Sequence, residues 1–150
     1  MQLKKALKTG QFLFITACIC SFLSCSFQYT HPKDYKGEVI SFGRGGGFTG
    51  KVSAYHLVDK GYLYQTDIMM DSFVLQKKLK PKQVKQLLRN YKHFEFDTLN
   101  INAPGNNYYY ISYYKKGVEH KIQWGERTQV IPSNLRSYFD LLFRLTQQED

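Results

Sequence analysis

A glycine-rich run from Ser41 to Val52 has the clearest potential for ligand chemistry in this sequence. It reads SFGRGGGFTGKV and holds five glycines between Gly43 and Gly50. In different registers it satisfies the dinucleotide-binding pattern GxGxxG, the kinase pattern GxGxxGxV and, except at its last position, the P-loop pattern GxxxxGK followed by Ser or Thr. Because such patterns hold phosphate groups with backbone N–H groups, the run raises the question of a nucleotide site.

The residues around the glycines argue against all three nucleotide sites. A P-loop needs a hydroxyl after its lysine to bind Mg²⁺, but Val52 follows Lys51. The P-loop and the dinucleotide fold also need a helix after the glycines, whereas VSAYHLV, residues 52–58, predicts a strand. A kinase loop does join two strands, but the chain is too short for that fold and has no HRD or DFG motif.

The glycines can still supply backbone geometry. They permit positive φ angles, or a close approach of the backbone to an aromatic ring or a ligand. Gly45, Gly46 and Gly47 beside Arg44 are a candidate anion nest, in which backbone N–H groups point at a negative charge. A flexible, wide connection between two strands is the alternative.

The remaining reactive side chains form no recognisable catalytic or metal-binding set. The four histidines lack the spacing of metal ligands: His31, His56, His93 and His120. Among the carboxylates, Glu95 and Asp97 lie close together in FEFD, where alternation predicts outward acids and inward phenylalanines. No base can be named for Ser41, Ser53 or Ser112, and GxSxG is absent. We therefore predict no catalytic residue, metal or cofactor, with a small hydrolase using a carboxylate or histidine near the glycines as the alternative.

Tyrosines crowd one segment, YYYISYY, residues 108–114. Alternation places Tyr109 and Tyr113 on one face of a strand, and Tyr108, Tyr110 and Tyr114 on the other. Since one face must leave the core, we predict that Tyr108, Tyr110 and Tyr114 bind a glycan or a protein, because aromatic rings offer large contact area at low entropic cost. The alternative is that these rings only cover the sheet, together with lysine stems.

Basic residues concentrate between Gln76 and Phe94, a stretch without any acid. The formal net charge of the chain is +9. Such a block suggests nucleic acid, anionic lipid or an acidic partner, although a solvated helix face gives the same pattern.

The elements that must position these residues can be read from periodicity and turn chemistry. Residues 38–42 predict a strand, residues 51–67 a hairpin that turns at Asp59–Gly61, and residues 72–79 a further strand. Pro81 begins an amphipathic helix, residues 103–106 predict a type II turn with positive φ at Gly105, and residues 108–124 form a second hairpin that turns at residues 115–117. A second helix begins at Pro132 and Ser133. The chain thus predicts an α+β fold: an antiparallel sheet of two hairpins plus short strands, in two hairpin-then-helix units, with both helices on one face.

The N-terminus has the plan of an exported protein. Lys4, Lys5 and Lys8 precede an apolar stretch from Phe12 to Leu23, which is shorter than the ~20 residues that span a bilayer. All three cysteines lie in or directly after this stretch: Cys18, Cys20 and Cys25. The domain behind them therefore has no disulfide or thiol chemistry available.

The residues Phe22, Leu23, Ser24 and Cys25 resemble the end of a bacterial lipoprotein signal, in which the cysteine is acylated and becomes the first residue of the mature protein. The usual box has an aliphatic residue three positions before the cysteine and a small one two before, whereas Phe22 and Leu23 stand there. Residues 15–18 fit that box better, but cleavage before Cys18 would leave only residues 12–17 as the apolar core.

This resemblance implies a signal peptide at 1–24, a lipidated tether at 25–37 and one domain at 38–150. The chain as a whole resembles small envelope lipoproteins of Gram-negative bacteria, a likeness that specifies no activity. Ser26 after Cys25 is not acidic, which by analogy with lipoprotein sorting favours the outer membrane, facing the periplasm. We expect a non-catalytic envelope protein that is anchored by lipid on Cys25 and binds a protein or an envelope polymer, with no nucleic-acid partner.

Overall fold

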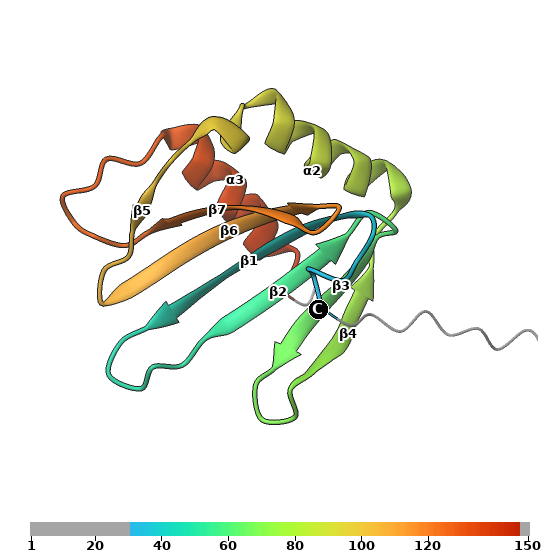
Figure 1. Cartoon of the computed structure of the whole chain (residues 1–150), viewed down its shortest axis with the longest axis horizontal. Helices are drawn as coiled ribbons and strands as arrows, with labels where there is room; N and C mark the ends of the chain where they lie inside the picture. Colours follow the sequence, from blue (N-terminus) through green and yellow to red (C-terminus); the bar gives the residue numbers. More distant parts are fainter. Residues whose placement is uncertain (1–30, 148–150) are drawn as a thin grey trace, which may run out of the picture.

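Seven strands form one mostly antiparallel sheet in the computed structural model, which describes residues 31–147. In chain order the elements are β1 (Glu38–Gly46), β2 (Ser53–Val58), β3 (Tyr62–Asp67), β4 (Ser72–Lys78), α2 (Pro81–His93), the 3-10 helix η1 (Phe96–Thr98), β5 (Asn102–Ala103), β6 (Asn107–Lys115), β7 (Val118–Trp124) and α3 (Ser133–Arg144). Across the sheet the strand order is β4-β3-β2-β1-β6-β7-β5 (Figure 1). The predicted α+β class is confirmed.

The two hairpins form where the turn residues predict them. Gly61 and Gly117 adopt φ angles of 91° and 79°, which a residue with a side chain rarely reaches. These glycines let β2 turn into β3 and β6 turn into β7. The strand β4 then follows the first hairpin before α2 begins, so the two halves of the chain are not equal hairpin-then-helix units.

Both helices contribute to one core against one face of the sheet. Pro81 occupies the first turn of α2, and the Gln83 side chain accepts a hydrogen bond from the Lys80 N–H at 3.1 Å, which caps the helix start. The core joins apolar residues of α2 (Val84, Leu87, Tyr91), of α3 (Leu135, Tyr138, Phe139, Leu142) and of the strands (Ile40, Phe42, Leu57, Ile111, Ile122). No helix within residues 31–147 is long and apolar enough to cross a bilayer.

The glycine run differs most from its prediction as a flexible connection. The strand predicted at residues 38–42 continues to Gly46, and β1 lies at the centre of the sheet between β2 and β6. Pairing on both sides satisfies the backbone groups of Gly43 and its neighbours and keeps them extended, which outweighs the low strand propensity of glycine. The connection to β2 is therefore confined to residues 47–52.

Two further predictions fail for tertiary reasons. The sheet is not wholly antiparallel, because the short strand β5 pairs in parallel with the end of β7. Gly105 does not take the positive φ of a type II turn; instead, a Cβ atom there would lie 2.5 Å from the carbonyl oxygen of Gly125. Glycine is thus needed at position 105 for close approach of two backbones.

The opposite face of the sheet, which we call the helix-free face, carries a second apolar cluster. Val39, Val58, Tyr64 and Tyr114 are its buried members. Tyr35 packs against this cluster and Pro32 is buried, so residues 31–37 lie on the domain along the last part of the predicted tether.

Candidate functional site

A cavity of about 410 Å³ opens at the end of the sheet where β1 ends and β2 and β6 begin. Its walls include Arg44, Gly45, Gly46, Lys51, Asn107 and Tyr108. Four of the residues predicted to bind a ligand, Arg44, Gly45, Gly46 and Tyr108, are thereby brought together from segments about 60 residues apart in the sequence.

Glycines in β1 make room for groups of the neighbouring strands β6 and β2. Gly43 and Gly45 pair with Tyr110 and Tyr108 in the neighbouring strand. A Cβ atom at Gly45 would lie 2.6 Å from Tyr108 Oη, and one at Gly43 would lie 3.0 Å from Tyr110 Cε1. A Cβ atom at Gly43 would also lie 2.1 Å from the Ser53 carbonyl oxygen. Real Cβ atoms do not approach heavy atoms that closely, so Gly45 makes room for the Tyr108 ring, and Gly43 makes room for the backbone of β2 beside the Tyr110 ring.

At the end of β1, Gly46 and Gly47 turn the chain away from the sheet with φ angles of 97° and 74°. The N–H of Gly47 donates to the carbonyl oxygen of Asn106 at 2.8 Å. That N–H is therefore committed to the fold, and the part of the predicted anion nest that borders the cavity consists of Arg44, Gly45 and Gly46.

Two cations border the cavity without a compensating carboxylate. Arg44 and Lys51 are both exposed, and the Arg44 guanidinium lies 4.9 Å from the centre of the Phe143 ring, which holds it against α3. Within residues 31–147 neither of these two cations forms an ion pair. The cavity is therefore suited to a negatively charged group.

The three predicted tyrosines have different surroundings. Tyr108 is partly exposed and lines the cavity, whereas Tyr110 is covered by Lys121, whose Nζ lies 5.3 Å from the ring centre. Tyr114 is buried and its hydroxyl donates to Glu119 Oε1 at 2.6 Å. Burial raises the pKa of the Tyr110 and Tyr114 hydroxyls well above the ordinary value of a tyrosine. Among the three, Tyr108 offers its ring to a ligand most directly.

Tyr109 and Tyr113 lie on the helix side, as alternation predicts. Tyr109 packs against Trp124 at a ring distance of 5.9 Å, and Tyr113 stacks on Tyr91 at 4.9 Å.

A buried chain of polar groups on the helix-free face was missed by the sequence reasoning. Ser41 Oγ lies 2.8 Å from His56 Nδ1, and His56 Nε2 lies 2.8 Å from Thr66 Oγ1. Both residues are visible in the sequence, but their proximity follows only from the strand register, which pairs Ser41 with His56 across β1 and β2. Serine beside histidine is the beginning of a nucleophilic site.

The surroundings of His56 do not favour catalysis. Ser41 and His56 are 3% and 7% exposed, and the Phe73 ring packs edge-on against His56 at 5.1 Å. Burial, with a smaller contribution from the charge of His31, lowers the pKa of His56 to about 3. Because protonation of this imidazole is strongly disfavoured, it is a poor acceptor for a serine proton at neutral pH.

The other candidates of the sequence analysis are structural. His120 donates from Nε2 to the carbonyl oxygen of Leu99 at 3.1 Å, so its Nδ1 accepts from the Tyr91 hydroxyl at 2.9 Å. FEFD is not an alternating strand: it follows α2 directly and leads into η1, with Phe96 buried but Phe94 42% exposed. Residues 31–147 contain no group of three histidine, cysteine or acidic side chains that could hold a metal ion. Cys25, the predicted lipidation site, lies outside the described residues.

Comparison with protein-family models finds no matching family, and a search of curated proteins finds no significant match.

Proposed function

We propose that this protein is a non-catalytic, lipid-anchored protein of the bacterial cell envelope that binds an acidic envelope polymer in the cavity at the end of β1. The observation that carries this proposal is the pair of exposed cations without an ion-pair partner, Arg44 and Lys51, in the walls of a cavity that Tyr108 also lines. One sugar of such a polymer can stack on Tyr108 while acidic groups of its neighbours meet the cations.

Anchoring is the part of this proposal supported by the sequence. The segment from Phe22 to Cys25 resembles a lipoprotein signal, and acylation of Cys25 would hold the domain at the membrane. The non-acidic Ser26 favours the outer membrane, facing the periplasm.

Binding is favoured over hydrolysis by the state of the histidines. Both ring nitrogens of His56 contact hydroxyl groups, and those of His120 contact a hydroxyl and a carbonyl group. The hydrolase alternative needs a histidine or carboxylate in the cavity, whose walls contain neither.

Acidic-polymer binding can be tested with polygalacturonate as the probe and neutral dextran as its control. Calorimetric titration should detect binding to polygalacturonate alone. The double substitution Arg44→Gln and Lys51→Gln should weaken binding by at least about tenfold, because charge-assisted contacts are lost. Lys121→Gln removes a cation away from the cavity and should leave binding within about twofold, as expected for a distant surface charge. Equal binding by all three proteins would contradict the proposed site.

The anchor is tested separately by growth with radiolabelled palmitate. The native chain should incorporate label, and Cys25→Ala should not. Continued labelling of Cys25→Ala would show that another residue carries the lipid, and Cys18→Ala would then test the second cysteine.

A further inference from the structure

The helix α2 packs on the helix side of the sheet, near the end opposite the glycine cavity. Near its start, the N–H of Leu79 donates to the carbonyl oxygen of Gly61 in the β2–β3 turn at 2.8 Å. Near its end, Lys92 Nζ contacts Glu38 Oε1 at 2.7 Å, at the first residue of β1. The helix therefore crosses the sheet end where β1 begins and both hairpins turn, as the upper part of Figure 1 shows.

This end of the domain concentrates positive charge. We define the basic end as residues 33–38, 59–60, 78–92 and 115–119. It holds eleven of the eighteen Lys and Arg residues, but only four of the ten Asp and Glu residues, within residues 31–147. The basic end thus has a formal net charge of +7, whereas all other described residues together have +1.

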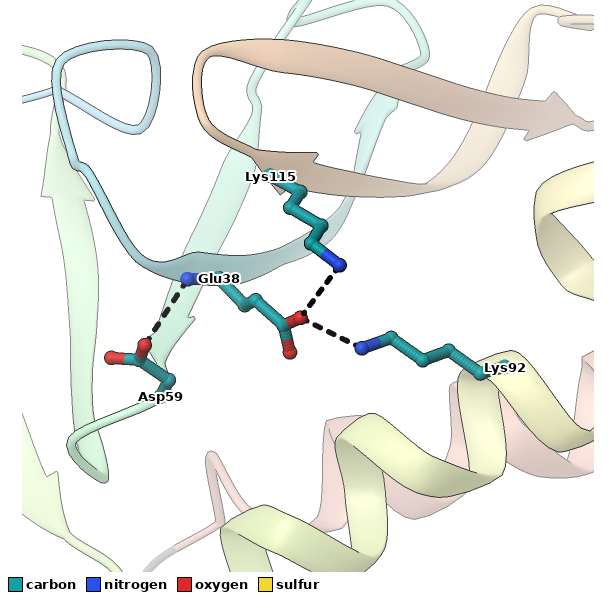
Figure 2. A network of polar contacts seen from close by, with 4 residues as sticks. All are labelled: Glu38, Asp59, Lys92 and Lys115. Carbon is teal, nitrogen blue, oxygen red and sulfur yellow. Dashed lines mark hydrogen bonds and ion pairs between the residues drawn. The ribbon is translucent and has the colours of Figure 1, made fainter.

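The main acids of the basic end are already occupied by internal partners. Figure 2 shows the Glu38 carboxylate between Lys92 and Lys115, at 2.7 and 3.6 Å. Asp59 accepts hydrogen bonds from the Tyr35 hydroxyl at 2.5 Å and from the Glu38 N–H at 3.2 Å.

The outward side of α2 stays positive and solvent-accessible. Val84, Leu87 and Tyr91 face the core, while Lys82, Lys85 and Arg89 are exposed. Lys85, Arg89 and Lys92 line an open cavity of about 600 Å³ beside the helix. None of these three forms an ion pair with an acid other than Glu38 within the described residues.

The chain that leads back to Cys25 touches this end before it reaches His31, whose ring lies 6.3 Å from that of Phe73 in β4. Tyr35 contacts Asp59, and Lys33 lies against the β6–β7 turn, where a Cβ atom at Gly117 would be 3.3 Å from the Lys33 carbonyl oxygen. Six peptide links separate Cys25 from His31, and they reach at most about 22 Å when fully extended. A lipid on Cys25 would therefore hold the domain close to the membrane, so that the charge of the basic end can select which end of the sheet faces it.

We propose that the basic end binds the headgroups of anionic phospholipids, so that α2 rests on the membrane and the glycine cavity points away from it. The closeness to a membrane rests on the proposed lipid anchor, while the headgroup binding does not. A negatively charged membrane attracts lysine and arginine over roughly one Debye length, about 8–10 Å. The four acids of this end are already counted in its net charge of +7.

The test uses the full chain with Cys25→Ala, so that no acyl group holds it, and sedimentation with vesicles. One set of vesicles contains phosphatidylcholine, and the other contains equal parts of phosphatidylcholine and phosphatidylglycerol. The protein should prefer the anionic vesicles, and added salt should abolish that preference.

Two variants that lose the same charge at different places distinguish binding by the basic end from an effect of overall charge. The apolar N-terminal stretch is present in both variants and therefore cannot cause a difference between them. Lys82→Gln, Lys85→Gln and Arg89→Gln together should reduce partitioning onto anionic vesicles by at least about tenfold. Arg127→Gln, Arg136→Gln and Arg144→Gln remove the same charge from elsewhere and should change it by less than about threefold. Circular dichroism checks that both variants are folded. Equal losses in the two variants, or no loss in the first, would overturn the proposal.

Two controls distinguish other outcomes. Displacement by inorganic phosphate at constant ionic strength would indicate a phosphate site and contradict membrane binding. Preference for anionic vesicles without palmitate labelling of the native chain would support the lipid surface but refute the anchor, so the two proposals can fail separately.

Discussion

The packing of Tyr108 over Gly45 predicts a measurable coupling between these two residues. In Gly45→Ala the new Cβ atom would lie 2.6 Å from Tyr108 Oη, 2.8 Å from its Cζ and 3.0 Å from Val52 Cγ2. All three neighbours are side-chain atoms, so the Tyr108 ring must move rather than the backbone. Overpacking of this kind costs about 1–3 kcal/mol.

Removing the ring should remove that cost. In the Tyr108→Ala background the same Gly45→Ala substitution loses its two closest contacts and retains the one with the Val52 methyl group. It then gains about 0.4–1 kcal/mol, because alanine has less conformational freedom in the unfolded chain and φ at residue 45 is not positive. The expected coupling between the two substitutions is therefore about 2 kcal/mol, well above the ~0.5 kcal/mol of independent sites.

The assay is urea unfolding of the four proteins, followed by far-ultraviolet circular dichroism. Gly50→Ala provides a control, because Gly50 belongs to the same run but a Cβ atom added there would have no neighbouring atom within 4 Å, and its φ is 60°. Its cost should come from backbone strain alone and stay the same with or without the Tyr108 ring. If Gly45→Ala lowers the free energy of unfolding equally with and without the Tyr108 ring, glycine is not required at position 45 to accommodate that ring, and the predicted coupling is refuted.

Two predictions concern pH. Burial disfavours the Glu38 carboxylate, but its hydrogen bond and charge interaction with Lys92, and the charge of Lys115, hold its pKa below the usual value. The stabilisation from this pairing is fully present above the pKa that Glu38 has in the unfolded chain, and it is lost as pH falls through the lower pKa of the folded state. Lys92→Met should raise the pKa of Glu38 in an NMR titration. The same substitution should lower the free energy of unfolding by no more than about 1 kcal/mol at pH 7. For His56, whose folded pKa of about 3 lies below the unfolded value of 6.5, stability should decrease as pH falls between these values, since only the unfolded state gains the proton. His56→Asn should flatten this pH dependence and the exposed His93→Asn should not; an unchanged slope in His56→Asn would show that another group causes it.

Elements with local signals could be predicted from the sequence. Both hairpin turns depend on a glycine with positive φ, at Gly61 and Gly117, and this requirement is met within a few residues. The helix that starts at Pro81 follows from its apolar stripe and from the fixed φ of proline. The separation of Tyr109 from Tyr108 on opposite faces follows from the two-residue period of a strand.

Pairings between distant segments could not be predicted in this way. The central position of β1, the parallel contact of β5 with β7 and the register that joins Ser41 to His56 each depend on strands far apart in the sequence. A glycine-rich segment has no alternating side-chain pattern that would predict a strand. Its conformation is decided by the neighbouring strands, which supply backbone hydrogen bonds on both sides.

The amino-acid sequence by itself determined the α+β class, the two hairpin turns and the amphipathic helices, because short-range sterics and periodic apolar residues specify them. The tertiary structure decided what the glycine run does. It is a strand whose missing side chains admit the ring of Tyr108 and the backbone of β2 beside the Tyr110 ring, and its end forms a cavity with Arg44 and Lys51. That arrangement exists only once β1, β2 and β6 lie side by side, since none of the contacts that create it is local in the chain.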